Sequence, residues 1–272
     1  MSDKMDAYER ALKEKEGLLV KGIHREASEK GLGIKISGSG IISDEEIRVS
    51  GSSRLPGGIK VKALHVSGSA LIDGDITAKE MKISGSCSAK GTVKAHKLEV
   101  SGSFDAKELK GGSAKISGSC SVEGQVTLED FLKASGSIAV KGDLHAERSI
   151  FLAGEFDVKG MLKTGDLKVK LNKSDCHVNG GIKARNVEVT RGKSEIGFFI
   201  LKLKKRRSGC LYTPFIRALD RVYVENVICN EISGRDVEIG DGCEVNGPIR
   251  YSRTFKVAST ARVAKKPIKC KV

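Results

Sequence analysis

Residue types that do acid-base or nucleophilic chemistry are scattered along this 272-residue chain without a shared spacing. His65, His96 and His145 lie three, six and nine residues before the next glycine of a recurring glycine-centred tripeptide. A catalytic base must reach its nucleophile within hydrogen-bond distance, and these offsets put the histidines on different faces of a repeat. No histidine or acid keeps a fixed offset to the repeated serines. We therefore interpret the histidines as solvated surface residues and expect no enzymatic site.

The sequence also contains no recognisable motif for thiol, metal or phosphate chemistry. The seven cysteines stand at positions 87, 120, 176, 210, 229, 243 and 270, none of them in a CxxC pair. Their spacing suits no zinc site, and neither a P-loop nor a GxGxxG turn opening a helix occurs. The start of the chain has no cationic segment followed by an apolar one, so no signal peptide is expected. These features favour reduced thiols in the cytoplasm, with no catalytic, cofactor-binding or metal-binding residues.

One basic and apolar segment is the strongest candidate for a binding site. Its candidate contact residues are Phe198, Phe199, Leu201, Lys202, Lys204, Lys205, Arg206 and Arg207. Apolar residues beside cations can bind at the surface of an anionic membrane. The alternative is a hairpin or helix that packs on the rest of the protein with a solvated charged tip. Nucleic acid is not expected as a partner, because the chain has no aromatic stacking platform and no recognised binding module.

The elements that would position these residues follow from an internal repeat. Ser-Gly-Ser recurs with its glycine at positions 38, 51, 68, 85, 102, 118 and 136, most often 17 residues apart. Around each glycine, apolar residues alternate with polar ones in three pairs per repeat. Leu64 and Val66, Ala70 and Ile72, and Ile76 and Ala78 form one such set. Alternation with a period of two is the pattern of a strand with one buried face.

Three short strands in about 17 residues predict an all-β fold, a triangular parallel β-helix or β-solenoid. Glycine at two of the three corners is expected because glycine readily adopts positive φ. The narrow interior also explains why only 4% of the residues are aromatic. In this arrangement Cys87 and Cys120 lie two coils apart, roughly 9–10 Å at the strand spacing, too far for a disulfide. Both are expected to act as small core residues.

The repeat divides the chain into four parts. Residues 1–32 are expected to be a helical or flexible segment, with a short helix over Asp3–Glu16. The main β-helix is predicted over 33–192, the basic and apolar insertion over 193–221, and further coils with a basic tail over 222–272. The formal charge of +14 is concentrated in the last two parts. Residues 193–221 hold eight cationic residues against two acids, and residues 246–272 hold eight against none.

The repeat, together with Val237–Val245 and Ile249–Val257, resembles the bactofilins, bacterial polymer-forming cytoskeletal proteins. The resemblance covers roughly residues 33–265. It implies a right-handed β-helix that self-assembles without nucleotide into non-polar filaments, often at the inner face of the cell membrane. The N-terminal helix, the additional coils and the insertion depart from the usual form of the family.

We therefore expect a non-enzymatic, cytoplasmic structural protein that assembles end to end with copies of itself. An anionic membrane surface or an acidic protein is a further candidate partner. The first alternative is a β-helical adaptor that does not polymerise and binds a partner or membrane through residues 193–221. The second is a hexapeptide-repeat transferase, although that class has coils of 18 residues in three equal parts, whereas most repeats here span 17.

Overall fold

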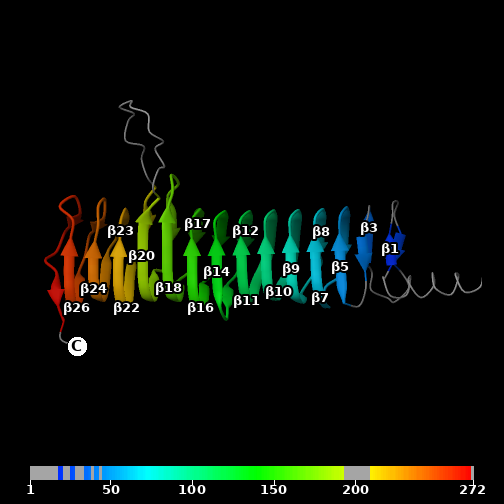
Figure 1. The fold of residues 1–272 in the computed structure, drawn as a ribbon, viewed down its shortest axis with the longest axis horizontal. Coiled ribbons are helices and arrows are strands. Elements are labelled where there is room, and N and C mark those ends of the chain that lie inside the picture. Colours follow the sequence, from blue (N-terminus) through cyan, green and yellow to red (C-terminus); the bar gives the residue numbers. More distant parts are fainter. Residues whose placement is uncertain are drawn as a thin grey trace, which may run out of the picture. The chain divides into compact units, whose positions relative to one another are not determined.

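The computed structural model describes residues 45–192 and 209–270 in full, and the backbone of four short strands before them. The described residues are built from strands and contain no helix (Figure 1). The short helix expected over Asp3–Glu16 lies outside the described residues. The prediction of an all-β parallel β-solenoid with about 17 residues per coil is confirmed.

The strands follow one another in a regular order. The first twelve are β1 (Leu18–Val20), β2 (Arg25–Ala27), β3 (Ile34–Ser37), β4 (Gly40–Ile42), β5 (Glu46–Val49), β6 (Ser52–Leu55), β7 (Ile59–Val66), β8 (Ser69–Ile72), β9 (Ile76–Ile83), β10 (Ser86–Val100), β11 (Ser103–Ile116) and β12 (Ser119–Val122). The next eight are β13 (Val126–Leu128), β14 (Phe131–Ala134), β15 (Ser137–Val140), β16 (Leu144–Leu152), β17 (Glu155–Val158), β18 (Leu162–Leu171), β19 (Cys176–Val178) and β20 (Ile182–Arg191). The last eight are β21 (Leu211–Tyr212), β22 (Phe215–Val224), β23 (Val227–Cys229), β24 (Glu231–Ile239), β25 (Glu244–Val245), β26 (Ile249–Val257), β27 (Arg262–Val263) and β28 (Ile268–Lys269).

The chain divides into two compact units. The first comprises residues 1–114 and 118–121, and the second residues 115–117 and 122–272. Both units are built in the same way, from coils whose strands pair in parallel with the coils before and after them.

Each coil contributes to three parallel ladders, which we number in the order in which the chain enters them after a Ser-Gly-Ser corner. In unit 1, Ser69 of the first ladder pairs with Ser86, seventeen residues later. Ile76 pairs with Val93 in the second ladder, and Met81 pairs with Leu98 in the third. The equal offset in all three ladders keeps the apolar columns in line from coil to coil.

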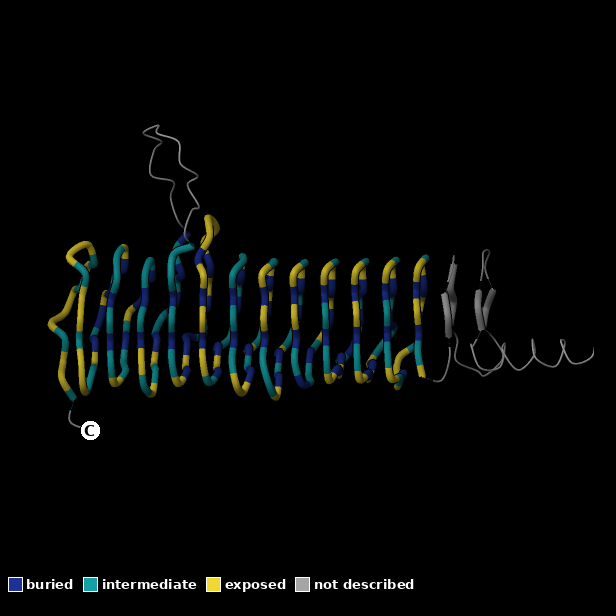
Figure 2. Tube along the Cα trace, viewed as in Figure 1, coloured by how far each residue is buried: buried dark blue, intermediate teal, exposed yellow. Residues whose placement is uncertain are grey.

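The core is the interior of the coils, filled by the apolar columns that the repeat predicts. In β10, buried residues alternate with more exposed ones along the strand. Figure 2 shows the same bands of buried positions recurring in successive coils, with exposed residues at the corners. Cys87 and Cys120 are buried in their column, with 2% and 5% of their surface exposed. Phe104 is likewise buried in that column.

Glycine is required at the Ser-Gly-Ser corner for a reason other than the expected one. Among the described glycines, positive φ occurs only at Gly58, Gly181 and Gly242, none of which belongs to this column. At Gly68, an added Cβ would lie 2.0 Å from the carbonyl oxygen of Gly51 in the preceding coil. The expectation of positive φ was therefore wrong here. The corner needs glycine because the backbones of stacked coils approach too closely for any side chain.

The first coil is covered by strands that run in the opposite direction. β4 pairs antiparallel with β5, and β3 pairs antiparallel with β6. β1 and β2 then pair antiparallel with β4 and β3. The sequence placed Ile34 and Ile36 in the parallel columns, with the β-helix starting at residue 33, but the parallel ladders start only at β5. A period of two identifies a strand without giving its direction, so the pattern could not show the reversal.

The insertion is also shorter than expected. Residues 193–208 lie outside the described residues, but β21 and β22 already belong to the ladders, where they pair in parallel with β19 and β20. The pairing of β22 with β24 shifts register between Arg217 and Arg221, which interrupts the alternation of buried and exposed residues. Because the alternation is interrupted, residues 215–221 do not show the period of two that identifies a strand. The expected end of the insertion at residue 221 therefore lies too far along the chain.

Candidate assembly surface

The residues predicted to contact a membrane lie outside the described part of the chain. Phe198, Phe199, Leu201, Lys202, Lys204, Lys205, Arg206 and Arg207 all belong to this group. The two ends of the segment that contains them are held at one corner. The backbone N–H of Gly192 donates to the carbonyl of Leu171 at 2.7 Å, and that of Gly209 donates to the carbonyl of Asn172 at 2.8 Å. The chain therefore leaves the coil and rejoins it beside two consecutive residues, and the ladders continue in register.

A polar network joins the coils next to this corner. The backbone N–H of Arg191 donates to Glu225 at 2.9 Å, and its guanidinium donates to Asp241 at 2.8 Å. The Tyr223 hydroxyl donates to the other oxygen of Glu225 at 2.8 Å, which raises the pKa of Tyr223 to about 12. Burial favours a higher pKa at Glu225, but its hydrogen bonds outweigh burial and lower that pKa. The network holds the tyrosine neutral and the carboxylate charged, which suits a structural clamp.

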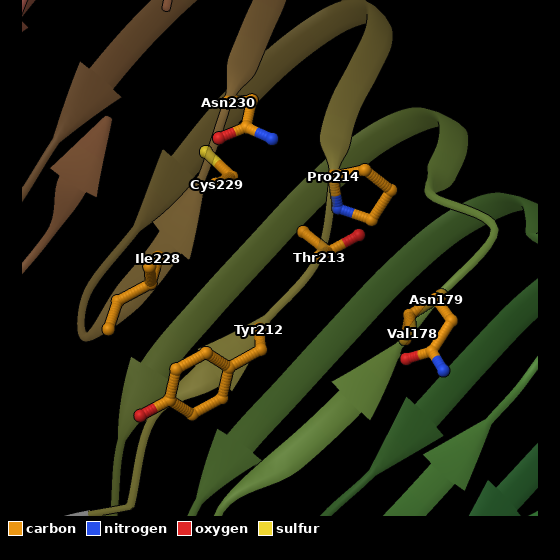
Figure 3. Close-up of a pocket in the computed structure, with 8 residues that line it drawn as sticks. All are labelled: Val178, Asn179, Tyr212, Thr213, Pro214, Ile228, Cys229 and Asn230. Atoms are coloured by element: carbon orange, nitrogen blue, oxygen red, sulfur yellow. The ribbon is translucent and has the colours of Figure 1, made fainter. Parts of the chain in front are cut away.

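An open hollow of about 320 Å³ lies between three successive coils of unit 2. Its lining residues are Val178, Asn179, Tyr212, Thr213, Pro214, Ile228, Cys229 and Asn230 (Figure 3). The Tyr212 ring stacks on His177, with the ring centroids 5.1 Å apart. No carboxylate or cationic side chain lines the hollow. Burial raises the pKa of the Cys229 thiol to about 12, so this cysteine is a poor nucleophile at neutral pH.

The other core thiols are held in the same protonated state. Burial raises the pKa of Cys87 and Cys120 to about 12, and that of Cys176 and Cys243 to about 11. All seven cysteines are free, with no disulfide between them. Across the described ranges, no group of three or more histidine, cysteine or acidic side chains is placed to hold a metal ion. The three histidines lie on different parts of their coils: His65 on the third ladder, His96 on a corner and His145 on the second ladder. This agrees with their different distances in sequence from the next repeat glycine.

Apart from Leu219 in β22, the most exposed large apolar residues among those described in unit 2 lie in its last coil. In the third ladder, Ile239 pairs with Val257 of that coil. Ile239 is 1% exposed, whereas Val257 is 48% exposed. Val245 is fully buried, whereas its partner Val263 in the last coil is half-buried. Ile268 is 51% exposed and pairs with Arg250, an outward position of the second ladder. In Figure 2 the buried positions become sparse in this last coil, beside the marked C-terminus. The apolar interior of the solenoid is therefore open at this end.

The backbone is open at the same place. Residues 254–257 of β26 pair with β24 on one side, and no described strand pairs with them on the other. β27 likewise pairs only with β25 among the described strands. An unpaired strand edge with apolar side chains beside it is a template for another strand. The last coil is also basic, because residues 246–272 contain eight lysines and arginines and no acid.

The arrangement can bind another β structure, and the sequence identified its main features. It predicted further coils over residues 222–272, which include this last coil. It did not anticipate the antiparallel strands at the first coil. No helix of the described residues is long and apolar enough to span a bilayer. Comparison of the chain with protein-family models, curated proteins and solved structures gave no match.

Proposed function

We propose that this chain is a non-enzymatic structural protein that assembles with copies of itself through its last coil. The observation that carries the proposal is the open end, where Val257 and Ile268 are half exposed beside an unpaired strand edge. A second copy that continues the ladders would bury Val257 and pair the free backbone groups, with Ile268 at the rim of the joint. Burying the exposed half of the Val257 side chain contributes roughly 1 kcal/mol, and the new backbone hydrogen bonds add to this.

Two further points support the proposal. The resemblance of the repeat to the bactofilins implies end-to-end polymerisation. The antiparallel strands β3 and β4 already pair with the first coil, so the edges of β5 and β6 are occupied. The last coil offers the clearer template for parallel continuation.

Sedimentation velocity and negative-stain microscopy of the full chain test the proposal. Wild type is expected to form an elongated species larger than the monomer, in a proportion that rises with protein concentration. The double variant Val257→Lys/Ile268→Lys is expected to stay monomeric, because two charges would enter the joint. Leu219→Lys is the matched control, since Leu219 is 76% exposed and lies in β22 rather than in the last coil. All three changed positions are exposed, so circular dichroism is expected to show the same fold in every variant.

Monodisperse wild type across salt and protein concentration would rule out self-assembly and favour an adaptor. Assembly of Val257→Lys/Ile268→Lys at the wild-type level would move the joint away from the last coil.

A further inference from the structure

The outward side chains of the second ladder in unit 2 form a row dominated by cations, one residue from each coil. The register of the ladder places them in line. The register begins at Thr127 and ends at Ile268, and we call the six residues between them the second-ladder row: His145, Lys163, Lys183, Arg217, Ser233 and Arg250. The row contains four lysines or arginines and no acid. Neighbouring members are about 4.8 Å apart, the spacing of paired strands.

The other two faces of unit 2 mix charges of both signs. In the third ladder, Lys168 lies beside Glu188 and forms an ion pair with it at 3.1 Å. In the first ladder, Glu244 lies beside Arg262. Acids therefore lie among the cations of these two ladders, whereas the second-ladder row contains none.

The acids near the second-ladder row neutralise only part of it. Glu231 accepts hydrogen bonds from Arg217 at 3.2 Å and from Arg250 at 2.9 Å. His145 lies 3.4 Å from Glu147. Lys163 and Lys183 are exposed and form no ion pair with any described residue, and the same holds for Arg185, two positions after Lys183. Three neighbouring cations therefore remain available to a partner.

Unit 1, taken by itself, carries uncompensated lysines on its own second ladder. Lys60 pairs in register with Thr77, and Thr77 with Lys94. Lys79 follows two residues after Thr77 in β9. These three lysines are exposed and form no ion pair within the described ranges.

The chemistry of the row identifies the class of partner that fits it. Lysine acts as a point charge on phosphate and does not read bases by itself. Duplex DNA carries one negative charge per about 1.7 Å of its axis, so a basic face that spans several coils lies close to phosphates at any position along the duplex. No aromatic residue belongs to the row. Single strands are usually bound through stacking on aromatic rings, so the row suits a duplex better.

We propose that the second-ladder face binds the phosphate backbone of double-stranded nucleic acid without sequence preference. The sequence argued against nucleic acid because stacking platforms and recognised modules are missing. Contact with the backbone of a duplex requires neither of them. This inference is independent of the proposed assembly, because its three unpaired cations, Lys163, Lys183 and Arg185, lie in coils before the last one.

Fluorescence anisotropy with a labelled mixed-sequence DNA duplex, measured over a range of salt concentrations, tests the inference. The test variant is Lys163→Gln/Lys183→Gln/Arg185→Gln in the full chain. The matched control is Lys141→Gln/Lys159→Gln/Lys173→Gln, which removes the same charge from exposed lysines of unit 2 outside the second ladder. Every other cation, including those of residues 193–208, is retained in both variants.

Wild type and the control are expected to bind the duplex with affinities within about threefold of each other. The test variant is expected to bind at least about tenfold more weakly near 0.1 M salt, with the slope of log K against log salt reduced by about 2 to 3. Equal weakening of both variants, or no binding by wild type, would overturn the proposal. So would stronger competition by a single strand, an acidic polysaccharide or anionic vesicles than by unlabelled duplex at equal charge.

Discussion

The interior coils and the last coil of unit 2 carry the same apolar pattern, yet their side chains differ in exposure. Ile239 and Val257 pair in one column, and their exposed fractions are 1% and 48%. Both residues are apolar and β-branched, and each follows a charged residue. The difference arises because Ile239 has a coil on each side and Val257 has a coil on one side only. In a solenoid, burial therefore depends on the next repeat as much as on the residue itself.

The largest expected effect in this comparison is on stability. Ile239→Ala is expected to lower the free energy of unfolding by about 2–5 kcal/mol, because it leaves a cavity in a closed column. Val257→Ala is expected to cost less than about 1 kcal/mol, because Val257 is half exposed in the isolated chain. Urea denaturation of dilute, unassembled protein measures both values. Equal losses would show that the last coil is as closed as the interior.

A somewhat smaller effect is expected at the corners between coils. In Gly154→Ala the new Cβ would lie 1.8 Å from the carbonyl oxygen of Gly136, so stacked backbones must separate. We expect a loss of about 1–3 kcal/mol. In the control Gly234→Ala, the nearest atom is a methyl group of Val222 at 3.1 Å, and the loss is expected to be below about 1 kcal/mol. Thermal unfolding compares the two, and a larger loss at Gly234 would contradict the close-approach explanation.

The smallest expected effect concerns the ion pair that ties the last coil to the one before it. The Arg253 guanidinium donates to Asp236 at 2.7 and 2.5 Å, and these bonds, with one from Thr254, hold the pKa of Asp236 well below its usual range. A carboxylate with a lowered pKa stabilises the fold above its unfolded pKa of about 3.9, and this contribution is lost as pH falls towards the folded pKa.

The melting temperature of wild type is therefore expected to exceed that of Asp236→Asn at pH 6, with a difference that shrinks between pH 4 and pH 2. Thermal scans at fixed ionic strength measure this change. Because both side chains lie at the surface, the difference at pH 6 is expected to be small. A difference that stays constant down to pH 2 would show that the ion pair does not tie the last coil in place.

The sequence predicted the interior better than the ends. The columns containing Leu64, Val66, Ala70 and Ile72 are buried as expected, because a core that repeats every coil leaves a periodic signal. Residues 215–221 of β22 were missed because the register shift between Arg217 and Arg221 breaks that period. The antiparallel direction of β3 and β4 leaves no signal in a pattern of alternating residues.

The last coil and the second-ladder row also differ in how far the sequence predicted them. The last coil lies within residues 222–272, which the sequence predicted as further coils, but the exposure of Val257 is visible only in the structure. The second-ladder row was missed, because its members are 16 to 34 residues apart in sequence and come together only through the register of the ladder. The predicted membrane-contact residues between Phe198 and Arg207 lie outside the described residues, so their role stays a prediction.

Amide hydrogen exchange tests most directly whether a second copy continues the ladders of the last coil. Exchange at residues 254–263 is compared between assembled wild type and monomeric Val257→Lys/Ile268→Lys, followed by mass spectrometry of peptides. If copies join through this coil, those amides are expected to become protected in the assembly, while peptides from the interior of unit 2 exchange equally in both samples. Assemblies that form with residues 254–263 still exchanging as fast as in the monomer would contradict the proposal.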